Sequence, residues 1–386
     1  MAADPHPSAD PLPDQRSLFE TDRAVAYFNT ANLSPLLGAA RDAGERALEQ
    51  RARPWTIGAP DWFSDVEALR TRFGELIGSS ADSVALVPAT SYGLAVAARN
   101  LGAEPWQRVI VLDEEYPSNY YTWRRFGRRT GAKLVVVTRQ PGGDWTDAVL
   151  AEIDERAAVV AVPNVHWTDG SLIDLPRVAA AAHEAGASLV IDASQSLGAM
   201  PLDVATLRPD ALVAVGYKWL LGPFALSYLY LDERHHGGEP LEENWILRAG
   251  SEDFARLVDY RDEYLPGARR FDMGQRTSFQ LVPMALAALE QLLRWHPERI
   301  SATLGSLTAE IANRAEAAGY ETPADAGRGP HMLGLPLPEG SRDPLSAALS
   351  NAGVVAAFRG SALRIAPHLH NDADDVTRLL DALAAA

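Results

Sequence analysis

The sequence contains no cysteine. This absence excludes disulfide bonds, thiolate metal sites and any cysteine nucleophile. Nine histidines are present, but none has the HExxH spacing of a zinc enzyme. The pair His235–His236 lies beside Gly237–Gly238, a composition typical of a solvated loop. The sequence therefore predicts no metal site.

Long apolar runs and an excess of basic residues are also missing. No apolar stretch reaches the ~18 residues that a membrane-spanning helix needs, and no basic start followed by an apolar run indicates a secretory signal. The 35 basic residues face 51 acidic ones, a formal net charge of −16. Such a balance disfavours binding to nucleic acid or to anionic lipid. We expect a cytoplasmic protein without nucleic-acid or membrane partners.

The 386 residues are too many for one compact core, so we expect two domains. Residues 1–22 begin with Pro, Ala and Asp without apolar periodicity and are predicted to form an N-terminal arm. Within residues 23–270, Val/Ile/Leu runs alternate with helical stretches, which predicts a large α/β domain with a mainly parallel sheet covered on both faces. Residues 271–386 predict a smaller α+β domain. The part from 233 to 270, rich in charge, glycine and aromatics, is expected to be a long irregular excursion.

Two polar residues follow consecutive apolar strands near the middle of the chain. Asp192 ends SLVIDAS, and Lys218 follows the strand in VAVGYKWLLGP. Alone, each has an ordinary interpretation, as a helix N-cap for Asp192 and as a surface lysine for Lys218. Ligands of open α/β sheets bind at the carboxyl ends of strands, however. A buried lysine is a usable nucleophile, and a carboxylate can hold the protonated nitrogen of a pyridine ring.

The strings IDASQSLG and GYKWLLGP resemble the class V aminotransferase family of fold-type-I pyridoxal-phosphate enzymes. The similarity runs from YFNTANLSPL at residue 27 to LRIAPHLHN at residue 371. That family includes cysteine desulfurases, kynureninases, isopenicillin N epimerase-like enzymes and C–S lyases. The resemblance implies a fold-type-I transferase fold, pyridoxal 5′-phosphate held by Lys218 as a Schiff base, and Asp192 at the ring nitrogen. It also implies an α-amino acid substrate, bound as an external aldimine.

The resemblance implies further roles around this centre. Thr90 and Ser91 open a helix after a strand and would hold the cofactor phosphate, although a plain helix cap suits the same geometry. Tyr116 matches the position that stacks on the pyridine ring. Arg364 matches the arginine that clamps the substrate α-carboxylate, with an ion pair between the domains as the alternative. The other implied contacts are Gln195 with the ring oxygen, Asn164 and His166 near the ring or substrate, Tyr217 with the phosphate, and Gln275, Arg276 or Thr277 with the phosphate across a homodimer interface; His368 is a further candidate near the substrate.

The sequence leaves the reaction itself open. An aminotransferase needs Lys218 to move a proton between the substrate α-carbon and the cofactor, and an eliminating lyase needs the same first transfer followed by loss of a β-substituent. The missing cysteine argues against a standard cysteine desulfurase. We expect an aminotransferase, with a β-eliminating C–S lyase as the alternative and hydrolytic, epimerising or decarboxylative chemistry behind it. The joint presence of Lys218, Asp192, Gln195 and Arg364 disfavours a non-catalytic binding module.

Overall fold

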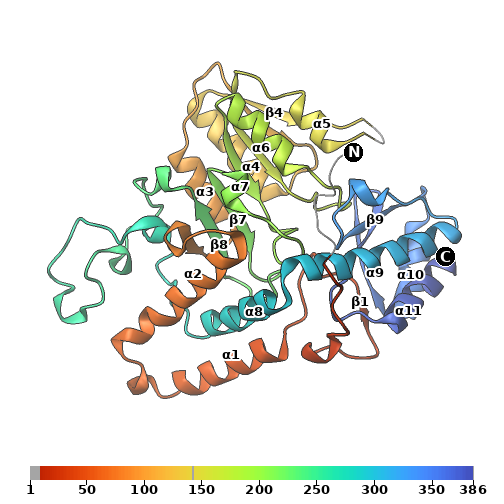
Figure 1. Cartoon of the computed structure of the whole chain (residues 1–386), viewed down its shortest axis with the longest axis horizontal. Coiled ribbons are helices and arrows are strands. Elements are labelled where there is room, and N and C mark those ends of the chain that lie inside the picture. Colours follow the sequence, from red (N-terminus) through yellow and green to blue (C-terminus); the bar gives the residue numbers. More distant parts are fainter. Residues whose placement is uncertain (1–8, 141–142, 386) are drawn as a thin grey trace.

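A seven-stranded sheet forms the centre of the larger part of the molecule in the computed structural model, which describes residues 9–140 and 143–385 (Figure 1). Its strand order is β2-β8-β7-β6-β5-β3-β4. The strands are β2 (Val84–Val87), β3 (Arg108–Leu112), β4 (Lys133–Val137), β5 (Ala157–Pro163), β6 (Ser188–Asp192), β7 (Ala211–Val215) and β8 (Ser227–Leu231). Residues 1–8 of the expected N-terminal arm lie outside the described residues.

The sheet is mainly parallel, as the sequence predicts, but β8 runs antiparallel to both of its neighbours, β7 and β2. The alternation of apolar runs and helices in the sequence does not specify the direction of β8. Its direction follows from the connection before it, because residues 216–226 include no helix that could carry the chain back for a parallel crossover. Lys218 lies in this short connection.

Helices cover both faces of the sheet, as Figure 1 shows. Successive residues of a strand point to opposite faces, so Ile110 and Leu112 belong to one apolar cluster, and Val109 and Val111 belong to the other. The first cluster also takes residues from α1, α2, α5, α6, α7 and α8, and the second from α3 and α4. These helices are α1 (Gly38–Arg51), α2 (Ser64–Ile77), α3 (Thr90–Asn100), α4 (Pro117–Thr130), α5 (Trp145–Leu150), α6 (Leu175–Glu184), α7 (Val204–Leu207) and α8 (Leu281–Trp295).

The C-terminal part contains a three-stranded antiparallel sheet of order β11-β12-β9 with its own apolar cluster. Its elements are α9 (Pro297–Ala317), β9 (Leu333–Pro336), α10 (Arg342–Asn351), β10 (Val354–Val355), β11 (Ala357–Arg359), β12 (Ala362–Ile365) and α11 (Ala373–Ala384). A short strand near the other end of the chain, β1 (Ala26–Tyr27), pairs in parallel with β10. Ala26 and Phe28 thus join the apolar cluster of the C-terminal part.

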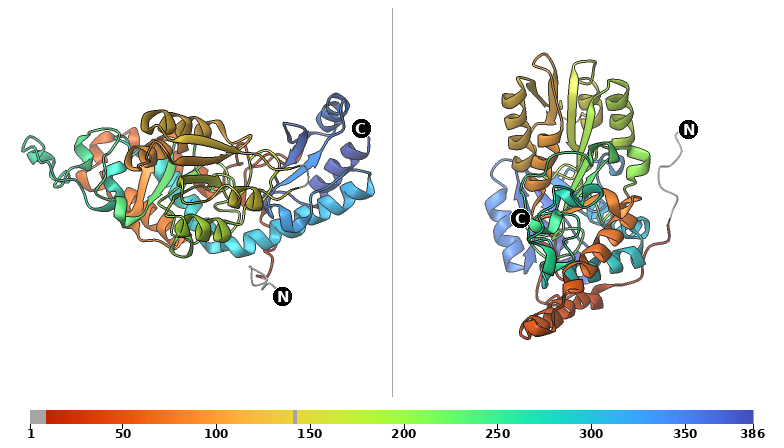
Figure 2. Two further views of the ribbon diagram at one scale, coloured as in Figure 1. Left: turned by 90° about the horizontal axis from the view of Figure 1, so that it is seen from above. Right: turned by 90° about the vertical axis from the view of Figure 1, so that its left-hand side faces the viewer.

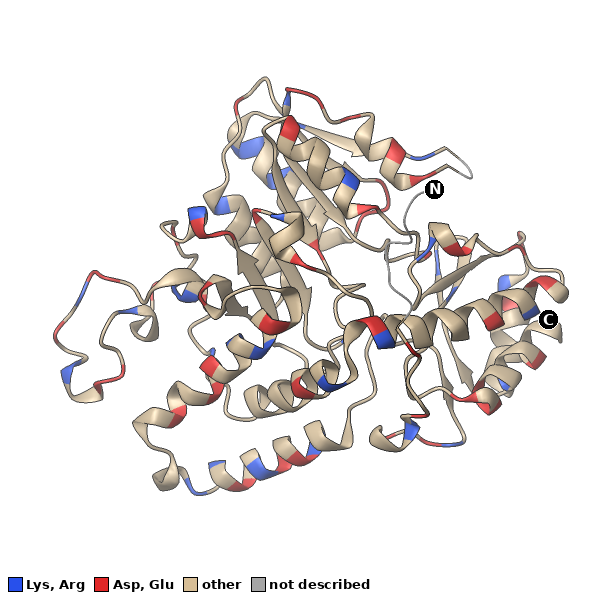
Figure 3. Cartoon of the chain, in the orientation of Figure 1, with Lys and Arg blue, Asp and Glu red and all other residues tan. Residues whose placement is uncertain are grey.

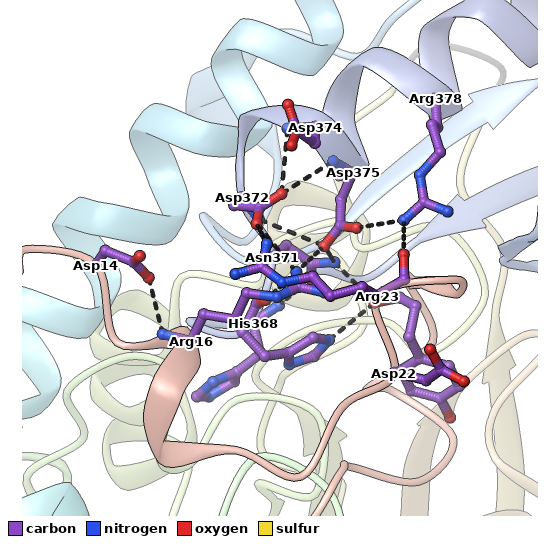
Figure 4. A network of polar contacts seen from close by, with 12 residues as sticks. Asp14, Arg16, Asp22, Arg23, His368, Asn371, Asp372, Asp374, Asp375 and Arg378 are labelled. Carbon is purple, nitrogen blue, oxygen red and sulfur yellow. Dashed lines mark hydrogen bonds and ion pairs between the residues drawn. The ribbon is translucent and has the colours of Figure 1, made fainter.

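The N-terminal arm is tied to the same region by charged contacts (Figure 4). The buried Arg16 donates to the backbone oxygen of His370 at 2.8 Å and pairs with Asp375 at 2.5 Å. Arg23 pairs with Asp372, the N-cap residue of α11. Arg16 and Arg23 thus connect the N-terminal segment to the start of α11.

The irregular excursion that the sequence predicts from 233 to 270 is observed, and it contains only the 3₁₀ turns η5 (Glu233–His235), η6 (Trp245–Leu247), η7 (Phe254–Arg256) and η8 (Gly267–Phe271). Its middle projects away from the rest of the molecule in two views (Figures 1 and 2). Acidic and basic residues are interspersed along most elements (Figure 3). Within the described ranges, no helix combines the length and apolar character needed to cross a membrane.

Candidate active site

Several strands end at one edge of the central sheet, and a polar or aromatic side chain follows each of them. Because β2 and β7 are both antiparallel to β8, β2 runs in the same direction as the parallel strands. Their carboxyl ends therefore meet, as expected for ligand sites in open α/β sheets. A cavity at this edge is lined by Thr90, Glu115, Tyr116, Pro163, Val165, Trp167, Asp192, Ser194, Gln195, Val215, Tyr217 and Lys218.

Lys218 lies at the cavity with only 6% of its surface exposed. Its Nζ atom is 5.3 Å from the centre of the Tyr116 ring. Burial lowers the pKa of Lys218 to about 8; the carboxylate of Asp192 opposes this shift, and the guanidinium groups of Arg364 and Arg359 add to it. An amine with this pKa exists partly in its unprotonated, nucleophilic form near neutral pH.

The two motifs that drew attention in the sequence pack directly on each other. Gly198 closes IDASQSLG with φ of 101°, and a Cβ atom built there would lie 2.2 Å from the backbone oxygen of Trp219. Only glycine permits this approach together with this backbone conformation. Gly198 thereby fixes the segment that carries Asp192 against the turn that carries Lys218.

Two buried carboxyl groups, those of Asp192 and Glu115, line the cavity. Asp192 accepts a hydrogen bond from the backbone N–H of Ser194 at 3.0 Å, and burial raises its pKa. Glu115 accepts one from the N–H of Tyr116 at 2.7 Å, while its Oε2 has no partner among the described residues. Burial, followed by the nearby Asp192, raises the pKa of Glu115 to about 8. The sequence alone does not single out Glu115, because DEEY contains three acidic residues and only burial distinguishes this one.

Replacing Glu115 with glutamine is expected to change the pH dependence of stability. The carboxyl group has a pKa of about 8 when folded, against an ordinary value of 4.5. The unfolded chain thus ionises first, and this group's contribution to stability falls as pH rises between these two values. In the ligand-free protein, Glu115→Gln should gain stability relative to wild type on the order of a few kcal/mol at pH 8.5 and little at pH 4.5.

Urea unfolding across this range measures the effect, with the exposed neighbour Glu114→Gln as control. A constant difference between Glu115→Gln and wild type at every pH would show that folding does not raise the pKa of Glu115.

The amide of Gln195 is held in one orientation. Its Oε1 accepts from the indole Nε1 of Trp219 at 3.0 Å, and its Nε2 donates to the backbone oxygen of Ala31 at 3.1 Å. An indole N–H can only donate and a carbonyl can only accept, so the two contacts exclude the flipped amide. His331 Nε2 bonds the backbone oxygen of Gln195, and burial lowers the pKa of His331 to about 4, so this histidine is a neutral donor. One N–H of Gln195 remains for a ligand in the cavity.

The other residues predicted from the sequence divide into two groups. Thr90 and Tyr217 line the cavity, and α3, which begins at Thr90, has no side-chain cap at its N-terminus. Ser91 is exposed and does not line it. Asn164 is buried and donates to the backbone oxygen of Ile173, and it is also outside the lining.

The two histidines proposed near the substrate are engaged or enclosed elsewhere. His166 stacks on Trp145 with ring centres 5.2 Å apart, and its two nitrogens contact Thr168 Oγ1 and the backbone oxygen of Asp113. Both ring nitrogens of His166 thus have a contact within the chain, and its role near the substrate stays a prediction. His368 is fully buried and packs near Trp219 and Trp295.

The segment Gln275–Thr277 does not line the cavity of its own chain. Arg276 is fully buried, lies 3.3 Å from Asp272 and has its guanidinium 5.4 Å from the Phe63 ring. Thr277 donates to the backbone oxygen of Trp62 at 2.9 Å. Their role at a partner's phosphate stays a prediction.

Arg364 lies on β12 and contacts Trp167, which is one of the residues that line the cavity. Its guanidinium donates to the backbone oxygen of Trp167 at 2.6 Å, and Trp167 meets Tyr116 edge-on at 5.6 Å. Burial lowers the pKa of Arg364 to about 9, and the neighbouring Arg359 contributes to this shift. Arg364 is therefore charged at neutral pH and lies next to the cavity that contains Lys218.

One feature of the composition points to Lys218 and was not used in the sequence analysis. The sequence contains only two lysines, Lys133 and Lys218, among 35 basic residues. Lys133 is exposed at the start of the edge strand β4. A chain that uses arginine almost everywhere else, yet keeps a lysine where it is buried, indicates that an amine is needed there.

The comparisons with known proteins agree with this geometry. A family model described as Aminotransferase class-V matches residues 60–376. An uncharacterised aminotransferase of Bacillus subtilis (strain 168) is 27% identical over 97% of this chain and 98% of its own. A kynureninase of Shouchella clausii is 23% identical over 97% and 91%, respectively.

Solved structures share the fold at low sequence identity. A C-DES variant with glycine covalently linked to its PLP cofactor has a TM-score of 0.85 and 17% identity, covering 97% of this chain and 99% of its own. The apo cysteine desulfurase of Thermococcus onnurineus NA1 has a TM-score of 0.82 and 17% identity, covering 97% and 98%, respectively.

Proposed function

Because the chain belongs to the class V aminotransferase family, whose enzymes depend on pyridoxal phosphate, we propose that it is an aminotransferase that acts on an α-amino acid at Lys218. The observation that carries the proposal is the placement of Lys218, a buried amine with a pKa of about 8, across one cavity from the carboxyl group of Asp192. The B. subtilis relative, similar over almost its full length, is also named an aminotransferase.

The residues of the cavity fit the cofactor of this family. Asp192 is a buried carboxyl group whose pKa is raised by burial, and a cationic ring nitrogen beside it would offset that cost. Tyr116 offers a flat ring near Lys218, and the uncapped start of α3 at Thr90 offers backbone donors for a phosphate. The remaining N–H of Gln195 suits a ring oxygen. When bound, pyridoxal phosphate supplies an aldehyde for the substrate amine and a ring that accepts electrons from the α-carbon.

Individual side chains of this protein then have separate roles in transamination. Lys218 Nζ can take a proton from the substrate α-carbon and return it, since its pKa lies close to neutral pH. Asp192 stays ionised next to a cation, and Tyr116 and Trp167 keep water away from the reacting atoms. Arg364 holds the α-carboxylate through the nitrogens that its contact with Trp167 leaves free.

The test is a panel of amino acids, each supplied with a 2-oxo acid as acceptor. Formation of the acceptor's amino acid supports the proposal. Ammonia and a 2-oxo acid formed without any acceptor would instead identify β-elimination, and cleavage to alanine would identify a kynureninase-type hydrolysis; either outcome would overturn transamination while leaving the family assignment intact. The homodimer expected from the family resemblance stays a prediction, which light scattering can test.

Trp219→Phe is expected to shift the titration of the bound cofactor's absorbance toward higher pH. Phenylalanine keeps the aromatic packing but removes the indole N–H that fixes Gln195, so the Gln195 amide is free to turn its oxygen toward the cofactor's ring oxygen. Losing a hydrogen bond to a charged group costs roughly 1.5–3 kcal/mol, which predicts a shift of about one pH unit or more.

Trp295→Phe is the matched control for this experiment. Trp295 is also buried and also donates its indole N–H to a glutamine, Gln15, at 2.9 Å. An equal absorbance shift in both variants, or none in Trp219→Phe, would mean that Trp219 supports the fold without orienting Gln195.

A further inference from the structure

Two arginines of one β-hairpin, Arg359 on β11 and Arg364 on β12, lie near the cavity. In the antiparallel pairing of β11 with β12, Ala357 faces Arg364 and Arg359 faces Ala362. Residues two apart on a strand share a face, so Arg359 and Arg364 lie on the same face as diagonal neighbours. Both approach Trp167: the guanidinium of Arg359 is 6.0 Å from its ring centre, and that of Arg364 donates to its backbone oxygen.

Neither arginine has an acidic partner within residues 9–140 and 143–385. The buried arginines other than Arg364 do have one: Arg16 pairs with Asp375, Arg70 and Arg276 with Asp272, and Arg328 with Asp325. The chain carries 51 acidic residues, so acids are not scarce. Two neighbouring cations without a counter-charge repel each other. The folded protein keeps such a pair only where another favourable interaction compensates for the repulsion.

The two guanidinium groups differ in what their surroundings leave free. Arg364 is 1% exposed and already contacts Trp167 and Asn29, with its Nε lacking a partner among the described residues. Arg359 is partly exposed and donates to the backbone oxygen of its neighbour Phe358 at 2.8 Å. One anionic group can bind deep in the site at Arg364, and a second can bind nearer to solvent at Arg359.

We propose that Arg359 binds a second anionic group of the substrate, so that the substrate class is α-amino acids with a negatively charged side chain. This proposal rests on the proposed function, in which Arg364 takes the α-carboxylate. The second group is a carboxylate or a sulfonate, since both offer the planar or trigonal set of oxygens that a guanidinium matches. Either anion cancels the positive charge that Arg359 adds next to Arg364 and Lys218.

The first experiment compares substrates in the holoenzyme. L-Glutamate and L-cysteate represent the carboxylate and the sulfonate, and L-glutamine is the neutral control. We expect kcat/KM for at least one anionic substrate to exceed that for glutamine by about ten- to hundredfold, the effect of one charge-assisted hydrogen bond. Arg359→Gln should remove this preference, because it lowers kcat/KM for the anionic substrate about ten- to hundredfold more than kcat/KM for glutamine. A variant that slows all three substrates equally would show that Arg359 acts on the α-carboxylate and would overturn the proposal.

Arg342→Gln is the matched control, because Arg342 is also an arginine of this domain, exposed, with its guanidinium 5.1 Å from the ring of Phe358, and it does not line the cavity. It should leave the preference intact.

A second measurement separates this proposal from the proposed function, because it needs no turnover. Calorimetry compares the binding of glutarate and pentanoate, which differ by one carboxylate, to the holoenzyme and to Arg359→Gln. Glutarate should bind wild type roughly tenfold or more tightly than pentanoate, and the variant should bind both alike. If this holds and no amino acid transfers its amino group, the proposed function fails and the second anion site stands. Turnover of amino acids with equal affinity for the two acids overturns the anion site alone.

Discussion

Lys218→Ala is expected to abolish turnover and the covalent attachment of pyridoxal phosphate while the protein stays folded. The side chain lies at a cavity rather than within an apolar cluster, and the buried charge of Lys218 itself costs free energy in the folded state. A nucleophile that also carries the proton has no substitute here, so we expect a loss of at least ~10³-fold in kcat. Steady-state rates and the absorbance of the reconstituted protein measure the two effects.

The lysine content of the chain makes the attachment site simple to identify. Borohydride reduction of the holoenzyme followed by peptide mapping should place the label on Lys218, and the single other lysine, the exposed Lys133, serves as an internal control. Lys133→Ala should retain full activity and full labelling. A label on Lys133, or labelling that survives in Lys218→Ala, contradicts the assignment.

Asp192→Asn is expected to keep pyridoxal phosphate bound but to lower kcat by roughly 10²–10⁴-fold, as loss of a catalytic carboxylate commonly does. The amide has nearly the same shape, so the loss isolates the charge. An asparagine cannot hold a proton on a ring nitrogen, whereas it caps a helix or turn about as well as aspartate does.

The N-cap of α6 provides the comparison for Asp192. Asp174 accepts a hydrogen bond from the backbone N–H of Arg177 and lies outside the cavity. Asp174→Asn should change neither kcat nor the cofactor's absorbance. Near wild-type turnover in both variants would reduce Asp192 to a structural role, because its contact with Ser194 would then be its whole function.

Much of the fold could be predicted from the order of the apolar runs in the sequence. The parallel strands, both helical faces and the change to an α+β pattern follow from Val/Ile/Leu periodicity, which depends on local sequence. The direction of β8 could not be predicted, because the composition of this strand is the same whether it pairs parallel or antiparallel with its neighbours.

The residues of the candidate site also include some that the sequence could predict and some that it could not. Lys218 and Asp192 were predictable because both follow strands whose carboxyl ends must meet. Glu115 and Arg359 were not singled out, since only burial distinguishes the first from two adjacent acidic residues and only the absence of a partner distinguishes the second from other arginines. The contacts of His166 with Trp145 and Asp113 could not be predicted either, because these residues come from other parts of the chain.

The contacts between the two ends of the chain have a consequence for folding order. Arg16 and Asp375 are separated by 359 positions, and β1 pairs with a strand more than three hundred residues later. During synthesis, strands β3 to β7 can pair with strands that are close in sequence. Ala26 and Phe28, in contrast, cannot be covered until β10 and α11 have emerged. Closing so long a loop is entropically costly and slow compared with local pairing. The segment around β1 therefore docks late, and Ala26 and Phe28 remain exposed until β10 and α11 have been made.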